Sequence, residues 1–427
     1  MRILLVSNVP IKKENNIGNS LLNLFEKIDG ISFADVYTRA GIPDDEISRA
    51  FCITEAMLIK NAIKGTAAGS LVEPMKVHTQ VRNSRNENHI IEFMKMHRWT
   101  VFFWMQNAVW KFGKWKSKDL EDFVKDFEPD FVFAVLSNSV YLNDLIRYVH
   151  SISKAKLVLY AWDNNYSLRR FMLSPLRWIK HFIDRASMRK LASRADLFYV
   201  ISDIQKEDYE KAFHKNCKLL TKGADFLESP CFKENHNEPL QLIFTGNIGT
   251  NRWKSLKMIA DVLENINRDG IKAQLRIYTA TPLTKKMEKA LSRGESSVLM
   301  GCVPASEIPE IQENADILVH VEALDLKNRL TVRQSFSTKI VDYLKAARPI
   351  LAVGPKDVAS IDHLIRNDCA IAADNKQELE RKLREVIEDE SILRRVVENG
   401  YECGRKYHNR QVIQTMLMND LNSICNQ

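Results

Sequence analysis

Residues 333–354 read RQSFSTKIVDYLKAARPILAVG, and this stretch decides the fold expected for the chain. After a polar start, the apolar side chains of residues 338–347 repeat with the spacing of an amphipathic helix. Ser337 is of a type that caps a helix N-terminus. The helix is expected to stop before Pro349, because proline disfavours helical geometry in the preceding residue. The apolar run 350–353 is then typical of a buried strand in an α/β sheet.

The start of this predicted helix is suited to an anion. Free backbone amides and the positive end of the helix dipole gather there. Lys339 in the first turn adds a positive charge suited to a diphosphate. Asp342, one turn further on the same face, can accept hydrogen bonds from the vicinal hydroxyls of a sugar. An ordinary helix with a solvated lysine–aspartate pair fits the same residues, so the stretch alone leaves both interpretations open.

The residue pattern of the stretch resembles the nucleotide-sugar-binding segment of glycosyltransferases with two facing Rossmann-like domains, the GT-B fold. It is most similar to the large retaining group 1 family that builds bacterial polysaccharides, whose pattern is S-x-(S/P)-T-K-φ-x-(E/D)-Y-L-x-x-x-(R/K)-P-I-L-A-x-G, with φ apolar. The resemblance implies an α/β chain with two Rossmann-like, doubly wound parallel-sheet domains that face a cleft. The matching residues are Ser335, Ser337, Thr338, Lys339, Asp342, Tyr343, Leu344, Arg348, Pro349 and Gly354.

Two positions depart from the family pattern. Asp342 stands where the family often has glutamate, and Gln334 stands where a second glutamate occurs eight residues earlier. The resemblance implies that Ser337, Thr338 and Lys339 contact the donor diphosphate and that Asp342 holds the ribose. Gln334 can hydrogen-bond a donor sugar but brings no charge to it.

Composition limits the other possibilities. A chain of 427 residues with 45% hydrophobic content suggests two or three domains with substantial cores. Seven cysteines without metal-ligand spacing indicate neither a disulfide framework nor a zinc site, which fits the cytoplasm. Residues 1–8 are too short for a signal peptide, and no apolar run reaches the ~20 residues that cross a bilayer. The net charge of +8 favours nucleotide phosphates, anionic lipid or nucleic acid as a partner.

The alternation of strand and helix patterns predicts the domain organisation. Residues 1–225 are expected to form the first, acceptor domain, 226–240 a linker, and 241–391 the nucleotide-sugar domain. The resemblance implies that helices in 392–427 pack back toward the first domain. A first helix is expected near 20–27, and the weak periodicity of 41–118 indicates a variable insertion.

Two residues of the first domain follow predicted strands. Gly18 comes after the strand 2–7, and the resemblance places its loop beside the donor, although a simple turn glycine explains it equally well. Asp163 comes after the strand 157–162, at the edge where parallel sheets carry active-site groups. The resemblance implies that Asp163 contacts the acceptor or takes its proton. A turn or helix cap in the run Asp-Asn-Asn is the alternative.

The second domain opens with a strand and the loop GNIGTNRWK at 246–254. Gly246 and Gly249 allow a phosphate close to the backbone, and two cations, Arg252 and Lys254, follow. The resemblance implies that this pair stabilises the leaving diphosphate, whereas a bare strand–turn–helix is the alternative. Glu322, at the end of the strand 317–322, is a further candidate that compensates at the donor sugar for the uncharged Gln334.

Two segments point to a membrane surface. Residues 90–118 contain four tryptophans among basic residues, and 169–194 carry eight Arg/Lys against a single Asp184 with apolar residues at helical spacing. A core helix explains the first segment as well, and a solvated face or a nucleic-acid patch explains the second. Their coexistence favours peripheral contact with the inner face of the cytoplasmic membrane over nucleic acid.

Together these features predict transfer of a sugar from a nucleotide-sugar donor to a hydroxyl of a lipid-linked glycan in bacterial surface polysaccharide synthesis, with retention. No D-x-D motif occurs, so neither a metal nor another cofactor is expected. A nucleotide-sugar epimerase of the same fold and a non-catalytic partner that binds membrane or polymer are the alternatives.

Overall fold

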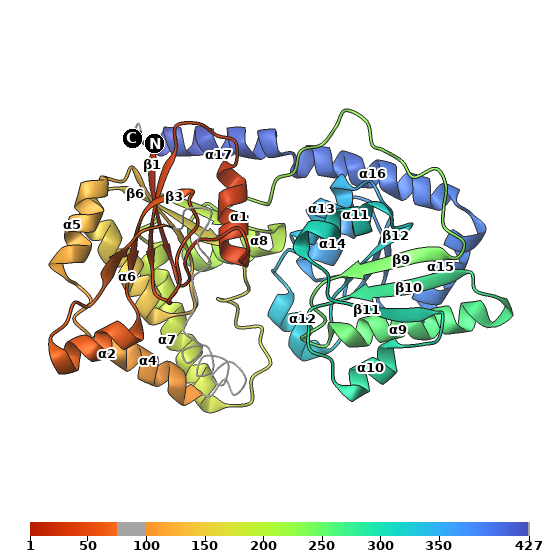
Figure 1. Cartoon of the computed structure of the whole chain (residues 1–427), viewed down its shortest axis with the longest axis horizontal. Helices are drawn as coiled ribbons and strands as arrows, with labels where there is room; N and C mark the ends of the chain where they lie inside the picture. The colour runs from red at the N-terminus through yellow and green to blue at the C-terminus, as the bar shows by residue number, and fades with distance from the viewer. Residues whose placement is uncertain (75–99, 426–427) are drawn as a thin grey trace.

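The computed structural model describes residues 1–74 and 100–425, which form two α/β domains side by side (Figure 1). In the first domain, strands and helices follow one another along the chain. They are β1 (Arg2–Ser7), α1 (Asn16–Phe25), β2 (Ser32–Tyr37), β3 (Ile47–Cys52), α2 (Glu55–Lys64), β4 (Ser70–Val72), α4 (Thr100–Phe112), α5 (Lys118–Phe127), β5 (Phe131–Val135), α6 (Val140–Ser153), β6 (Lys156–Ala161), α7 (Pro175–Ala192), β7 (Leu197–Val200), α8 (Asp203–Phe213) and β8 (Lys218–Leu219).

The second domain repeats the alternation and is followed by two long helices. Its elements are β9 (Leu240–Thr245), α9 (Arg252–Ile266), β10 (Ala273–Tyr278), α10 (Lys285–Leu291), β11 (Ser297–Gly301), α11 (Ile308–Glu313), β12 (Ile317–Val321), α12 (Leu326–Val332), α13 (Lys339–Lys345), β13 (Ile350–Val353), α14 (Ala359–Arg366), β14 (Ile371–Ala373) and α15 (Lys376–Glu388), with short 3-10 turns at Asn267–Asp269 and Ala305–Glu307. The final helices are α16 (Ser391–Tyr407) and α17 (Arg410–Cys425).

Each domain is built on one mainly parallel sheet. The first has the order β4-β3-β2-β1-β5-β6-β7-β8, and the second has the order β11-β10-β9-β12-β13-β14. Among the described pairings, β3 with β4 is antiparallel and the others are parallel. The strand order reverses between β1 and β5 and again between β9 and β12, so each sheet has a switch point at which a crevice opens beyond the strand ends. The predicted fold class, two doubly wound parallel-sheet domains, is confirmed.

The cores explain why the sheets are parallel. The central strands β5, β6 and β13 are buried along most of their length, as apolar runs covered on both faces require. The first domain has an apolar cluster on each face of its sheet, one centred on Ile3, Phe131 and Tyr199 and one on Leu4, Val132 and Phe198. These fixed sheets hold the loops at their carboxyl ends in place.

The last helix crosses back to the first domain. Figure 1 shows α16 along the second domain and α17 over the first, near α1. The Tyr199 hydroxyl donates to Asp420 Oδ2 over 2.9 Å, and Arg410 Nε donates to Asp225 Oδ1 over 2.8 Å. Residues 224 and 409 also form an isolated parallel bridge. Because α16 packs against α13 and α17 against α1, the tail connects the two domains.

Some predicted elements differ from the structure. The first helix begins at Asn16 rather than near residue 20, because the Asn15 side chain caps it by accepting from Gly18 N over 2.7 Å. Segment 41–118, in which weak periodicity indicated a variable insertion, contains β3, α2, β4 and α4 among its described residues. Residues 90–99 of the predicted membrane segment lie outside the described residues. In the described part of the chain, no helix is long and apolar enough to span a bilayer.

We expect Tyr199→Phe to lower the free energy of unfolding by about 1–3 kcal/mol, because it leaves the nearly buried Asp420 carboxylate without its hydroxyl donor. Chemical denaturation measures the change. Tyr278→Phe, at a half-buried tyrosine of β10, is the matched control and should shift the transition less. Equal midpoints for Tyr199→Phe and wild type would contradict the anchoring role of α17.

Candidate active site

The carboxyl ends of β9 and β12 meet at the switch point of the second sheet. Gly246 follows β9 directly, and Glu322 follows β12. The α13 helix brings Lys339 to the same edge, and α9 begins there with Arg252. Four of the residues selected from the sequence therefore lie in one small region, although they come from separate parts of the chain.

Lys339 reaches the end of β9 through a gap that Gly246 leaves open. Its Nζ donates to the carbonyl oxygen of Thr245 over 2.7 Å. A Cβ atom added to Gly246 would lie 1.7 Å from this Nζ, and the φ angle of Gly246 is +151°. Any side chain at position 246 would displace the ammonium group, so glycine here is required by the lysine as well as by the backbone.

Arg252 and Glu322 form a two-pronged ion pair beside this lysine. Arg252 Nε and Nη2 donate to the two Glu322 oxygens over 3.0 and 3.1 Å. Glu322 is only 4% exposed, and its burial raises the pKa of the carboxyl while the guanidinium lowers it in part. This ion pair fixes the orientation of the planar Arg252 guanidinium at the crevice. Glu322 thus acts on Arg252, a contact that the sequence alone did not indicate.

The charges of this cluster act on one another. Burial, and then the nearby Arg252 cation, lowers the pKa of Lys339 to about 8, while Asp342 and Glu322 oppose that shift. The Asp342 carboxylate accepts a hydrogen bond from Lys222 Nζ over 2.6 Å. A lysine this close to neutrality gains its full charge when an anion approaches, which suits a diphosphate site.

The beginning of α13 differs from the prediction. Ser337 was expected as its N-cap, but the helix begins at Lys339 and Thr338 occupies the cap position without a side-chain cap hydrogen bond. The reason is a tight turn, in which Ile340 N donates to Ser337 O over 3.1 Å and Val341 N to Thr338 O over 3.2 Å. Both Ser337 and Thr338 are half-buried residues at the entrance to the helix.

Gln334 lies elsewhere than expected. Its side chain is completely buried, and its amide donates to Asp208 Oδ2 on α8 of the first domain. Arg333 binds the same carboxylate, and Ser202 Oγ donates to Gln334 O over 2.7 Å. Gln334 therefore takes part in the contact between the domains. It does not join Lys339 and Arg252 at the switch point of the second sheet. Nothing in the local sequence pattern around Asp208 marks it as a partner of these residues.

The remaining residues of the β9–α9 loop have local roles. Gly249 N donates to Asn247 Oδ1 over 2.6 Å and so closes the turn. Lys254 is exposed, and its Nζ lies 5.9 Å from the centre of the Trp253 ring. The role expected for Lys254 at the leaving diphosphate stays a prediction.

Asp163 stands where the first domain meets the second. Its side chain hydrogen-bonds Ser335 of the second domain, and its carbonyl accepts from Gln205 Nε2 over 3.0 Å. Although the residue keeps contact with solvent, the protein groups around its carboxyl raise its pKa by desolvation, and the bond to Ser335 offsets part of this. A carboxylate with a raised pKa is a better proton acceptor.

Gly18 packs against the loop that precedes α1. A Cβ atom there would lie 2.1 Å from Lys12 O. The structure gives this glycine a packing role, and contact with a donor stays a prediction.

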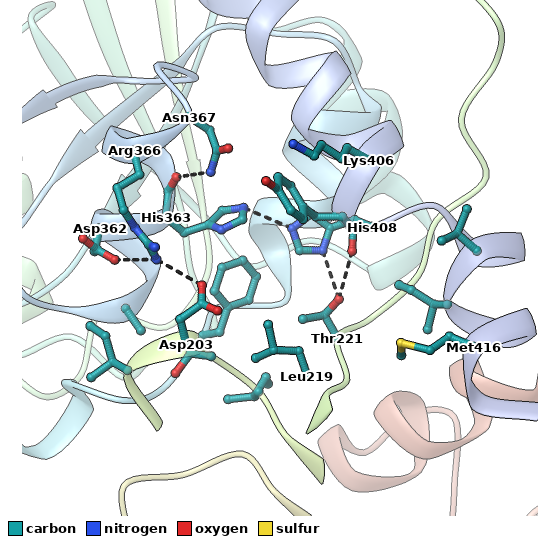
Figure 2. Close-up of a pocket in the computed structure, with 18 residues that line it drawn as sticks. Asp203, Leu219, Thr221, Asp362, His363, Arg366, Asn367, Lys406, His408 and Met416 are labelled. Atoms are coloured by element: carbon teal, nitrogen blue, oxygen red, sulfur yellow. Dashed lines mark hydrogen bonds and ion pairs between the residues drawn. The ribbon is translucent and has the colours of Figure 1, made fainter. Parts of the chain in front are cut away.

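A separate cavity lies between the domains (Figure 2). It is bounded by the start of α8, by α14 and by the junction of α16 with α17, and His363 Nε2 and His408 Nε2 lie 3.3 Å apart in its wall. None of Gly246, Arg252, Glu322 and Lys339 lines it. In the described part of the chain, no group of three His, Cys, Asp or Glu side chains is placed to hold a metal ion.

Residues 239–389 match the family model described as Glycosyl transferases group 1. The matched residues span the second domain from β9 to α15 and include Gly246, Arg252, Glu322 and Lys339.

Similar solved structures extend over both domains. HepE of Anabaena, in complex with UDP, is 14% identical with a TM-score of 0.63, and the match covers 99% of this chain and 100% of that one. Sucrose-phosphate synthase from Thermosynechococcus elongatus is 11% identical with a TM-score of 0.62, over 99% and 98%. TarM matches over 71% of this chain and 57% of its own, with 11% identity and a TM-score of 0.52. A search of curated protein sequences found no match. These likenesses confirm the GT-B fold.

We expect the Lys339 ammonium to titrate near pH 8 in the folded protein and to titrate higher in Arg252→Gln, which removes a neighbouring positive charge. Carbon-13 NMR of dimethylated lysines follows the titration, with Lys339→Met to assign the signal. Because the folded pKa lies below the usual 10.5, the unfolded chain binds more protons between about pH 8 and 10.5, so this group makes stability rise with pH over that window. A Lys339 signal that titrates above 10 would contradict the burial of its charge.

Proposed function

We propose that this protein transfers a sugar from a nucleotide-sugar donor to a hydroxyl group of a glycan acceptor, with retention at the anomeric carbon. The observation that carries the proposal is the Lys339 ammonium held against Gly246 beside Arg252, at the switch point of a group 1 domain. That HepE was solved with UDP, with UDP-glucose and with UDP and glucose supports a uridine nucleotide as the first donor to test.

The chemistry requires positive charge at this place. Breaking the anomeric C–O bond builds positive charge on the sugar ring and negative charge on the departing diphosphate. Fixed cations aimed at that anion stabilise the transition state most when water is excluded. Lys339 and Arg252 are both partly buried and already oriented by protein partners, so little reorganisation is needed when the charge develops.

The other residues complete the proposed site. Asp342 takes the ribose hydroxyls, and the backbone near Ser337 and Thr338 faces the phosphates. Asp163, from the first domain, contacts the acceptor hydroxyl and accepts its proton. The cations take the part that a divalent metal plays in other transferases, so the reaction proceeds without one.

A donor panel tests the proposal. UDP-, GDP- and ADP-sugars are incubated with the full chain, with and without a bacterial lipid extract, and released nucleotide and altered donor are measured. Nucleotide release that depends on the extract supports glycosyl transfer. Conversion of the donor sugar without acceptor would identify an epimerase instead. Absence of binding and turnover for the whole panel would indicate that the protein is a non-catalytic partner.

Lys339→Met should lower kcat/KM for the donor about a hundredfold. Losing one contact that stabilises an oxyanion in the transition state typically has an effect of about this size. The melting temperature should stay equal or rise, because the substitution removes a desolvated charge. Lys345→Met, an exposed lysine on the same helix, is the matched control and should behave as wild type. Activity of Lys339→Met within a factor of two of wild type at subsaturating donor would remove Lys339 from the site.

Arg252 needs a different design, because Arg252→Ala would leave the buried Glu322 carboxylate without a partner. The double variant Arg252→Met/Glu322→Gln removes both charges and therefore separates catalysis from folding.

We further propose that the acceptor is lipid-linked and that α7 lies on an anionic membrane at the inner face of the cytoplasmic membrane. On α7, Leu176, Ile179 and Phe182 are 55%, 50% and 55% exposed, among exposed cations. Lys180 Nζ lies 5.0 Å from the centre of the Phe103 ring, so α4 adjoins this face (Figure 1). An apolar helix face bordered by cations favours an interfacial position. In the predicted membrane segment 90–118, Trp110 and Trp115 are buried, so the residues around these two tryptophans belong to the core of the first domain.

Leu176→Gln/Ile179→Gln should reduce binding to phosphatidylglycerol-containing vesicles about tenfold or more, because two apolar side chains no longer leave water. Vesicle sedimentation at low and high salt measures it. Leu227→Gln, at a still more exposed leucine in the interdomain segment, should leave binding unchanged. Equal binding of the double variant and wild type would contradict a membrane role for α7.

A further inference from the structure

A lysine of the first domain reaches the candidate nucleotide site. Lys222 Nζ lies 2.6 Å from Asp342 Oδ1 on α13. The lysine side chain is 17% exposed and that of Asp342 39%, so the pair is largely sheltered while one side of the carboxylate remains open. The two residues are 120 positions apart and belong to different domains.

The backbone around Lys222 is fixed on both sides. Gly223 N donates to Asn23 Oδ1 over 2.9 Å, and Ala224 N donates to His408 O over 2.9 Å. A Cβ atom on Gly223 would lie 2.8 Å from the Cα of Arg410, so the segment is pressed against the start of α17. Figure 2 shows the neighbouring Thr221 bonded to His408 at the same junction. The origin of the lysine side chain is therefore defined by the first domain and by α17.

The pair constrains the carboxylate without saturating it. A carboxylate offers about four lone-pair sites, and Lys222 occupies one of them on Oδ1. Without the lysine, a half-exposed aspartate on a helix surface samples several rotamers, and this freedom must be lost when a ligand binds. A charge-assisted hydrogen bond from an anchored lysine removes that freedom in advance.

We propose that Lys222 is a positioning residue that holds the Asp342 carboxylate ready for the two vicinal hydroxyls of a nucleotide's ribose. The nucleotide site is then completed by the first domain, so that donor affinity depends on the arrangement of the two domains. This inference rests on the proposed function, because it takes Asp342 as the ribose-binding group.

Calorimetry with two ligands tests the inference. The first ligand is the nucleoside diphosphate that binds most tightly among UDP, GDP and ADP, and the second is its 2′,3′-dideoxy analogue, which lacks the hydroxyls. Wild type should prefer the ribonucleotide by about tenfold or more, as expected for hydrogen bonds to a charged group. Lys222→Met should bind the dideoxy analogue as wild type does and lose most of the preference, whereas Lys222→Arg should retain it.

Matched variants separate the possible failures. Lys27→Met removes an exposed ion pair with Asp225 at the same end of the first domain and should leave the preference intact. If Asp342→Asn keeps the full preference, the ribose assignment in the proposed function is wrong. If Asp342→Asn loses it but Lys222→Met keeps it, the role of Lys222 is overturned while the proposed function stands. Equal weakening of both ligands by Lys222→Met would also overturn the inference, since it would place Lys222 at the phosphates or in domain stability.

Discussion

The candidate site depends on one close approach: the Lys339 ammonium occupies the space that a side chain on residue 246 would fill. The lysine comes from α13 and the glycine from the end of β9, so the contact requires that the second sheet be complete. The Thr245 carbonyl holds the ammonium, and burial keeps its pKa near 8. An ammonium under this constraint is poorly solvated. An anion that enters the crevice would supply the electrostatic stabilisation that water gives to an exposed lysine.

The carboxylates around this contact bind partners that their sequence positions do not indicate. Glu322 is buried and holds Arg252, so it acts through the guanidinium. Asp342 is held from the first domain by Lys222, and Asp208 binds both Arg333 and Gln334. With the Ser335–Asp163 and Gln334–Ser202 hydrogen bonds, these contacts join residues 333–354 to the first domain. The arrangement of the domains and the geometry of the nucleotide site are therefore not independent.

The fold was predictable because its signals are local. The Pro349 stop and the apolar run after it marked α13 and β13. Helix α2 was missed although Thr54 caps its start and Gly65 its end, because Leu58 is buried while Ile59 and Ile63 are exposed, so its apolar residues do not mark one buried face. Four residues named from the sequence, Gly246, Arg252, Glu322 and Lys339, meet at one switch point. The partners of the site residues were not predictable, because the Arg252–Glu322, Lys222–Asp342 and Gln334–Asp208 contacts join residues 70 to 126 positions apart, and the last two also join the two domains.

The central claim is that the buried ammonium of Lys339 meets the diphosphate of a nucleotide. Proton uptake on binding measures this directly, by calorimetry of UDP at pH 8 in buffers that differ in ionisation enthalpy. A lysine with a pKa of about 8 is half protonated when free and fully protonated beside a diphosphate, so wild type should take up about half a proton per nucleotide and Lys339→Met none. Binding without proton uptake, or the same uptake by Lys339→Met, would contradict the account.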